Sequence, residues 1–361
     1  MTTRSHVLTL ALVATTLCGG VRAASLTAGM QKGTPELKSA GPATFAPEGI
    51  LLVGDTQGAT IYAIATGDAS TGSASQPFAV ENVDQKVAAL LGTTPTDILI
   101  NDMAVNPETG NTYLTVSRGR GPDANPAIVR VDSTGKVGEL SLDNVMFSKA
   151  PIPDAPTNDK QRQDVTTDLQ FVDGQVLVAG LSNEEFSSQL RVIPFPFAAV
   201  DKGASIEIYH GSHGKFETKS PVRTLAVFEI AGQANVLAAY TCTPLVKFPL
   251  SELKPGSKIK GTTVAELGNR NRPLDMVVYN KGGKDYLLMA NSARGVMKVD
   301  LTDVDKSNGI TERVADTAGL PYEPIQDLQK VTQLDRLDKN HAMLLVQSDS
   351  GGLNLKSVEL P

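Results

Sequence analysis

The amino-acid sequence predicts an all-β protein, a six-bladed β-propeller with four antiparallel strands in each blade. Short apolar runs of strand length recur along the whole chain, and Gly, Asn, Asp and Pro separate them. The chain contains 32 glycines, 21 prolines and no tryptophan, which suits many turns rather than long helices. The apolar runs group into units of roughly fifty residues, a period that is typical of propeller blades.

Each of the six units begins with a polar lead residue and an apolar strand, followed by a turn, a second strand, a loop and a third strand. The lead residues lie 54, 66, 56, 51 and 52 positions apart and are Glu48, Asp102, Asp168, Thr224, Asp275 and Asp327. The long second interval leaves a degenerate seventh blade as the alternative.

A fourth, outer strand fits between successive units. We expect these strands at residues 78–83, 137–142, 205–209, 262–267 and 310–314. The sixth unit has no such segment after it, so we expect the N-terminal residues 26–44 to supply its fourth strand and close the ring. An open ring would leave long strand edges exposed.

Residues 1–23 have the pattern of a secretory signal peptide, with a basic start at Arg4, an apolar run over 7–17 and small residues near 23. The mature chain would be residues 24–361, one propeller domain in a periplasm or outside the cell. No later apolar run is long enough to span a membrane. Without Arg4 and Arg22, 31 basic residues face 39 acidic ones, which argues against nucleic-acid binding. We expect a monomer that binds a small molecule or a protein.

The repeat over residues 45–360 resembles that of exported bacterial propellers of the YVTN/WD40-like type. Residues 45–55, Phe-Ala-Pro-Glu-Gly-Ile-Leu-Leu-Val-Gly-Asp, are similar to the opening blade of six-bladed propellers of the SMP-30/gluconolactonase type. That resemblance implies that Glu48 helps to hold a divalent metal, with Asn and Asp ligands from other blades. Asn101 with Asp102, and Asn271 with Asp275, are candidates, but the pattern is incomplete and no general base can be assigned.

The lead residues are expected to face one mouth of the ring, because the innermost strand of each blade lines the central channel. Five of them are carboxylates, namely Glu48, Asp102, Asp168, Asp275 and Asp327. In one interpretation each acid accepts backbone N–H groups and ties blade to blade. In the other, the acids hold a hard cation such as Ca²⁺ through their oxygens.

Two of the three histidines after residue 23 lie in the segment His210-Gly-Ser-His213, and Cys242 is the one cysteine outside residues 1–23. The blade pattern places all three residues at the same mouth, around the fourth unit. Imidazole and thiolate together suit copper or zinc. The alternative is two surface histidines in a polar loop and a small buried cysteine that packs as an apolar residue.

Polar side chains at the same mouth form a candidate ligand pocket, made by Asn101, Arg118, Asn271, Arg272 and Arg294. These arginines either pair with the acids or bind an anionic or sugar-like ligand through bidentate hydrogen bonds. Residues 141–165 are predicted to form a long loop over this mouth.

Two functions therefore remain open. The first is an exported, non-catalytic propeller that binds a ligand, metal or partner at its polar mouth. The second is a metal-dependent enzyme, either a lactonase-like hydrolase on the acidic residues or a copper or zinc redox site at His210, His213 and Cys242.

Overall fold

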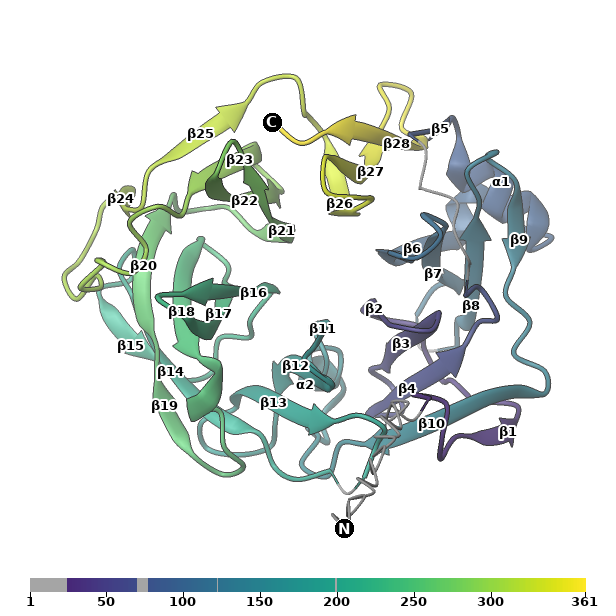
Figure 1. Ribbon diagram of the computed structural model, residues 1–361, viewed down its shortest axis with the longest axis horizontal. Coiled ribbons are helices and arrows are strands. Elements are labelled where there is room, and N and C mark those ends of the chain that lie inside the picture. Colours follow the sequence, from purple (N-terminus) through teal and green to yellow (C-terminus); the bar gives the residue numbers. More distant parts are fainter. Residues whose placement is uncertain (1–24, 70–76, 122, 199) are drawn as a thin grey trace, which may run out of the picture.

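The computed structural model describes residues 25–69, 77–121, 123–198 and 200–361, and the predicted signal peptide at 1–23 lies outside these ranges. Six antiparallel sheets radiate from a common centre and form a ring (Figure 1). We number the blades by the order in which their innermost strands occur in the chain. The predicted six-bladed all-β propeller is confirmed, and each blade has at least four strands.

The first three blades contain the following strands from the centre outward. Blade 1 consists of β2 (Ala43–Ala46), β3 (Ile50–Asp55), β4 (Thr60–Ala65), β10 (Val145–Pro151) and β1 (Gln31–Gly33). Blade 2 consists of β6 (Ile98–Val105), β7 (Thr112–Arg118), β8 (Asn125–Val131) and β9 (Val137–Glu139). Blade 3 consists of β11 (Asp168–Val172), β12 (Gln175–Leu181), β13 (Ser188–Pro194), β14 (Ala204–His210) and β15 (Lys215–Glu217), with β19 (Lys258–Lys260) parallel to β14.

The other three blades follow the same plan. Blade 4 consists of β16 (Thr224–Ile230), β17 (Gln233–Ala239), β18 (Pro244–Pro249), β20 (Thr262–Leu267) and β24 (Thr317–Gly319). Blade 5 consists of β21 (Pro273–Lys281), β22 (Lys284–Asn291), β23 (Gly295–Asp300) and β25 (Tyr322–Ile325). Blade 6 consists of β26 (Val331–Arg336), β27 (His341–Gln347), β28 (Leu353–Glu359) and β5 (Ala79–Val80). The helical elements are α1 (Val83–Leu90), α2 (Asp159–Arg162) and two 3₁₀ turns at Pro95–Asp97 and Leu250–Glu252.

The blades do not follow one another around the ring in chain order. The contacts between innermost strands give the circular order 1, 2, 6, 5, 4, 3 (Figure 1). After β4 the chain adds β5 to blade 6, builds blade 2, and returns through β10 to complete blade 1. It then forms blades 3 to 6, and blade 6 closes against blade 2.

The ring is closed by residues from the N-terminal part of the chain, but not by residues 26–44 as predicted. The fourth strand of blade 6 is β5, and residues 26–44 supply β1 and the start of β2 to blade 1. The innermost strand of blade 1 is β2, which has only four residues and precedes Glu48. The strand predicted to be innermost in this unit, directly after Glu48, is β3, the second strand of the blade.

Three other expectations were also wrong. Residues 78–83, expected as the outer strand of the first unit, contain β5 of blade 6, and β10 takes that place in blade 1. The fourth strand of blade 5 is β25, at Tyr322–Ile325, rather than residues 310–314. The predicted long loop at 141–165 contains β10 and α2, which accounts for the 66-residue interval without a seventh blade.

Apolar side chains fill the spaces between neighbouring blades. One cluster joins blades 2 and 6 and α1 through buried residues such as Val80, Val87, Val116 and Leu345. A larger cluster spans blades 3, 4 and 5. No helix among the described residues has the length and apolarity needed to cross a membrane.

We predict that the short strand β5 is important for stability, because Val80 is 4% exposed and pairs with Leu355 of β28. Val80→Ser should lower the free energy of unfolding by about 2 kcal/mol or more, through lost apolar burial and a buried hydroxyl. The matched control is Leu90→Ser on α1, where the side chain is 41% exposed, and its effect should stay below about 1 kcal/mol. Equal losses in urea unfolding followed by circular dichroism would contradict this role for β5.

Candidate functional sites: the central cavity and a histidine–cysteine cluster

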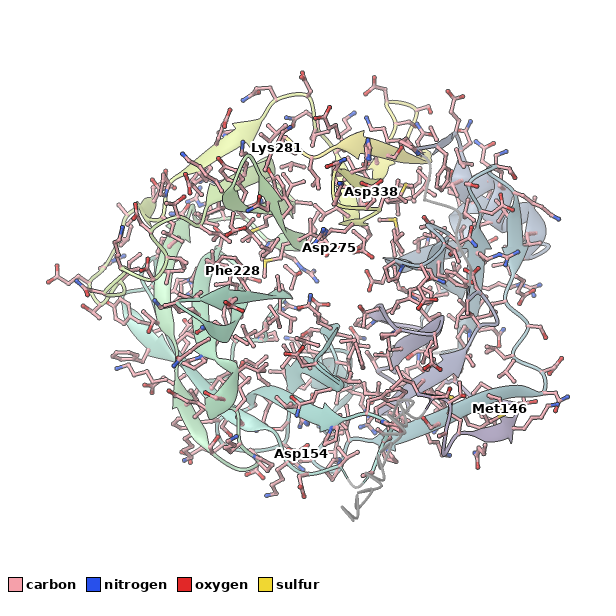
Figure 2. All side chains as sticks on the ribbon, viewed as in Figure 1. Met146, Asp154, Phe228, Asp275, Lys281 and Asp338 are labelled. Atoms are coloured by element: carbon pink, nitrogen blue, oxygen red, sulfur yellow. The ribbon has the colours of Figure 1, made fainter. Side chains whose placement is uncertain are left out.

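The innermost strands of all six blades surround a central cavity of about 1150 Å³. Residues from the segment 157–167, which includes α2, also line it, together with Arg223 and Arg272. Figure 2 shows Asp275 at the inner end of blade 5, beside the centre of the ring, whereas Met146 lies at the periphery. The innermost strands of the blades therefore line a shared central space, as the sequence predicts.

Four aspartates line this cavity and join neighbouring blades, and we call them the inner-strand carboxylates. Each Oδ2 atom accepts a backbone N–H group from the innermost strand of the adjacent blade. The bonds run from Ala43 N to Asp102 (2.7 Å), from Val105 N to Asp335 (2.7 Å), from Leu334 N to Asp275 (2.9 Å) and from Leu225 N to Asp168 (2.7 Å). These hydrogen bonds connect one blade to the next, as the first interpretation of the acids predicts. They are not the contacts of a cation site.

The remaining carboxylate oxygens are also engaged. Oδ1 of Asp168 accepts the N–H of Leu169 at 2.7 Å, and Oδ1 of Asp275 accepts that of Met276 at 2.8 Å. In the part of the chain that the structure describes, the inner-strand carboxylates form no group of three whose oxygens converge closely enough for one metal ion.

Two of the predicted acids do not lie in the cavity lining. Glu48 occupies the turn between β2 and β3, with φ of 63°, and its carboxylate accepts hydrogen bonds from Ser25 Oγ (2.5 Å) and Leu26 N (3.2 Å). Asp327 precedes β26 and is not part of the lining. Asp335, within that strand, lines the cavity in the position expected for Asp327.

The sequence explains why Asp335 was missed. In blades 2, 3 and 5 the cavity aspartate precedes a buried apolar residue, as in Asp168-Leu169. Asp327-Leu328 fits that pattern, whereas Asp335 precedes Arg336. Val331 and Leu334 are the buried apolar residues of the same strand, and they are the signal from which the place of Asp335 could have been predicted.

Burial raises the pKa of every inner-strand carboxylate, and repulsion among the aspartates adds to this effect. The pKa of Asp102 is raised to about 8, that of Asp168 to about 7 and that of Asp335 to about 6, while that of Asp275 lies well above its usual range. The side chains keep partial contact with the cavity. Near neutral pH the four groups therefore share protons instead of carrying four full charges.

The second site is the histidine–cysteine cluster, made by His210, His213 and Cys242. One ligand atom from each residue lies within 4.8 Å of the other two. His210 ends β14, and the tight turn after it brings His213 back over the first ring, with the two ring centroids 3.8 Å apart. Cys242 lies in the turn between β17 and β18 with φ of 66°, and its N–H donates to the carbonyl of Asn271 at 2.7 Å.

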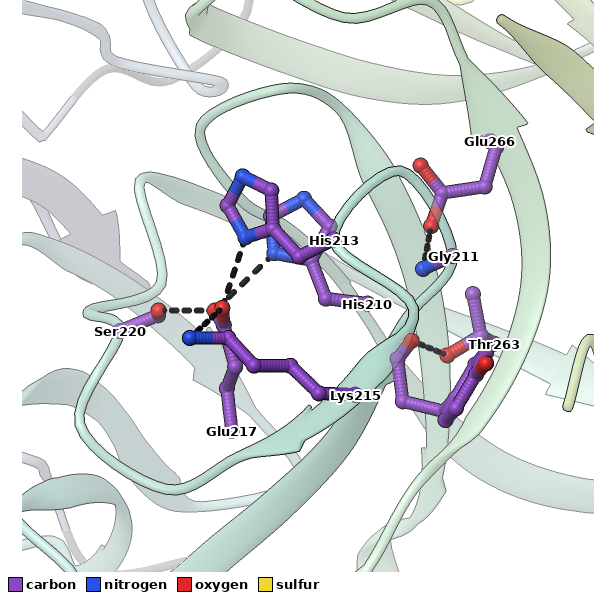
Figure 3. A network of polar contacts seen from close by, with 9 residues as sticks. His210, Gly211, His213, Lys215, Glu217, Ser220, Thr263 and Glu266 are labelled. Carbon is purple, nitrogen blue, oxygen red and sulfur yellow. Dashed lines mark hydrogen bonds and ion pairs between the residues drawn. The ribbon is translucent and has the colours of Figure 1, made fainter. Parts of the chain in front are cut away.

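A single carboxylate orients both imidazoles (Figure 3). Glu217 on β15 lies 3.0 Å from His210 Nδ1 and 2.7 Å from His213 Nδ1. Burial alone would raise the pKa of Glu217, but hydrogen bonds from Ser220 and the two histidines outweigh it and lower the pKa to about 2. Glu217 is therefore an ionised acceptor, and both Nδ1 atoms are placed to donate to it.

His210 is the residue that marks this cluster as a binding site. Its side chain is 3% exposed, and burial lowers its pKa although Glu217 opposes the shift. A neutral His210 that donates from Nδ1 carries its lone pair on Nε2. That buried Nε2 atom has no hydrogen-bond partner among the described residues.

The remaining predicted residues are dispersed. Asn101 and Arg272 line the cavity, and Asn101 Nδ2 donates to the carbonyl of Ala40 at 2.7 Å. Arg118, Asn271 and Arg294 are not part of the lining. Asn271 is buried against Asn291, and Arg294 pairs with Asp316 at 3.0 Å.

Three cavity arginines were not predicted from the sequence, Arg162 on α2, Arg223 and Arg336 on β26. Arg223 forms an ion pair with Asp164 at 2.8 Å. It directly precedes the lead residue of unit four, a position comparable to that of Arg272 before unit five, and this spacing was an available signal. The histidine–cysteine cluster does not line the cavity, so the mouth carries two separate sites.

Comparison with known proteins adds little to this description. No protein-family model and no curated protein matches the chain. It is similar to the PQQ-bound aldose sugar dehydrogenase from Streptomyces coelicolor, with 14% identity over 91% of this chain and 96% of that chain and a TM-score of 0.37.

Two further solved structures are similar to the chain. One is a chain of the mitotic checkpoint complex, with 9% identity, 99% coverage of both chains and a TM-score of 0.39. The other is an engineered GH43 glycoside hydrolase, with 10% identity over 73% of this chain and 52% of that chain and a TM-score of 0.35. Likenesses this distant carry no conclusion about activity or ligand. The six-bladed fold that the resemblance implied is present, and the comparisons assign no family.

The raised pKa values predict how stability depends on pH. Between about pH 4 and about pH 8 the folded protein binds more protons at the inner-strand carboxylates than the unfolded chain does, so its stability falls as the pH rises. The fall should be on the order of a few kcal/mol. Asp102→Asn keeps an oxygen for the Ala43 N–H but cannot titrate, so it should flatten the fall in urea unfolding experiments. The exposed control Asp303→Asn should not, and a stability that rises over this range would disprove the assignment.

Proposed function

We propose that this protein is an exported propeller that binds a soft or borderline metal ion, Cu(I) or Zn(II), through His210, His213 and Cys242. The observation that carries the proposal is the buried, unpartnered Nε2 atom of His210 beside a second imidazole and a thiol. Leaving such an atom without a partner costs about 1–3 kcal/mol, and a metal ion would satisfy it.

The donor set fits this chemistry. Two imidazoles and one thiolate are ligands that zinc and copper prefer, whereas calcium requires oxygen. In tetrahedral zinc sites the ligand atoms lie about 3.3–3.6 Å apart, so the present spacing needs only a small contraction. His213 and Cys242 are partly exposed and free to make it.

Glu217 supports the same interpretation. A histidine that ligates a metal commonly donates its other N–H to a carboxylate, which fixes the ring and raises its basicity. Glu217 is positioned to do this for both histidines at once. Three protein ligands leave a fourth position open, where an added ligand or water would bind.

The hydrolase alternative has weaker support. A lactonase-like site on the acidic residues requires several carboxylate oxygens that converge on one ion. The inner-strand carboxylates bind backbone N–H groups instead, and Glu48 lies outside the cavity lining.

The proposal predicts one equivalent of bound metal per chain. Co(II) added to the metal-free mature protein should give a thiolate-to-cobalt charge-transfer band, and Cys242→Ala should abolish that band. Glu217→Gln should weaken zinc binding by about 10–100-fold, since outer carboxylates tune metal sites to this extent.

The matched control is His341→Ala, which removes a histidine that pairs with Asp338 outside the cluster. It should bind zinc and cobalt as the unaltered protein does. Absence of stoichiometric metal in the unaltered protein, or equal loss in His341→Ala, would refute the proposal.

Export is tested separately. Residues 1–23 should be removed during secretion, so intact-mass spectrometry of protein from the periplasm or the medium should give a chain that begins at Ala24. Full-length protein that stays in the cytoplasm would show that the segment is not a signal peptide.

A further inference from the structure

We propose that the central cavity is a binding site for a small zwitterion, with its anionic group on Arg223 and Arg272 and its amine among the inner-strand carboxylates. The inference is independent of the metal site, because neither His210, His213 nor Cys242 lines the cavity. It rests on the charged side chains that the cavity lining brings together.

The cavity lining carries positive charge that the protein does not fully neutralise. Arg223 pairs with Asp164 at 2.8 Å. Arg272 has no side-chain hydrogen bond or ion pair among the described residues, although partial burial and the nearby Arg223 both lower its pKa. Arg162 on α2 and Arg336 on β26 also line the cavity. A guanidinium that is partly desolvated and repelled by another is well placed to bind a carboxylate in bidentate fashion.

The inner-strand carboxylates line the same cavity and supply acceptor oxygens. Asp168 accepts the N–H of Leu225, two residues after Arg223, and Asp275 lies three residues after Arg272. With a strand rise of about 3.3 Å per residue, Arg223 lies about 7 Å from Leu225 along the backbone, and Arg272 lies about 10 Å from Asp275. The carboxylates already accept backbone N–H groups, yet each keeps lone pairs for an ammonium group.

This combination of charges selects one class of ligand. A simple cation would leave Arg272 without a partner, and a simple anion would leave the free lone pairs of the aspartates unused. A molecule with a carboxylate at one end and an amine at the other satisfies both. The volume of about 1150 Å³ is ample for such a ligand together with ordered water.

The test is isothermal titration calorimetry on the metal-free protein, which prevents the probe from binding through a metal ion. The probe is 5-aminopentanoate, which carries a carboxylate at one end and an amine at the other. Pentanoate and pentylamine each keep one end of the probe and serve as matched ligands. We expect 5-aminopentanoate to bind at least about tenfold more tightly than either, as expected for one charge-assisted hydrogen bond.

Two variants examine the two ends. Arg272→Gln should weaken binding of 5-aminopentanoate by about tenfold or more, and Asp275→Asn should have a similar effect. Arg130→Gln, on β8 and outside the cavity lining, is the control and should bind as the unaltered protein does. Circular dichroism confirms that each variant is folded.

Three results would overturn the proposal. One is the absence of binding at millimolar 5-aminopentanoate, and another is binding of pentanoate or pentylamine with equal affinity. The third is an unchanged affinity in folded Arg272→Gln protein. Loss of metal in Cys242→Ala has no bearing on these outcomes, so the two sites are tested separately.

Discussion

The hydrogen bond from a backbone N–H group to an aspartate of the next blade is the interaction on which this ring depends. It occurs at four of the junctions between described innermost strands, through Asp102, Asp168, Asp275 and Asp335. Innermost strands of different blades do not share a sheet, so apolar packing alone would leave their spacing adjustable. A carboxylate that accepts an N–H from the neighbouring blade fixes both the distance and the direction.

The same bonds determine the chemistry of the centre. Burial raises the pKa of all four acids in the cavity, and repulsion from neighbouring aspartates adds to the shift at Asp102, Asp168 and Asp275. The backbone N–H groups oppose this shift because they favour the ionised form. The cavity is therefore acidic without being fully charged, and the arginines of its lining balance part of that charge.

The order of the blades adds a second constraint. Blade 1 is complete only when β10 returns to it, and blade 6 only when β28 pairs with β5 from the N-terminal part of the chain. Segments far apart in the sequence must meet before either blade has its full set of strands. Non-local pairing of this kind slows folding. The same pairing joins the N-terminal part of the chain to its C-terminal part. Ser357 Oγ, for example, accepts the N–H of Phe78 at 2.9 Å.

The sequence was sufficient for the fold class, the blade number and the neighbourhood of His210, His213 and Cys242, because periodicity and loop position are local properties. It failed where pairing is non-local. Nothing near Ala79 indicates that its partner is Lys356, and a strand as short as Ala43–Ala46 has no detectable period. Asp335 was missed because its neighbour is Arg336, and Glu217 because a single glutamate on a three-residue strand carries no pattern. The orientation of two imidazoles by one carboxylate is visible only in three dimensions.

The central claim is that the inner-strand carboxylates hold the ring together while the histidine–cysteine cluster holds the metal. Anomalous diffraction at the zinc absorption edge, from a crystal of the zinc-loaded protein, tests both halves at once. We expect an anomalous peak bonded to His210 Nε2 and Cys242 Sγ, and none among Asp102, Asp168, Asp275 and Asp335. A peak coordinated by those aspartates, with an empty histidine–cysteine cluster, would contradict the claim.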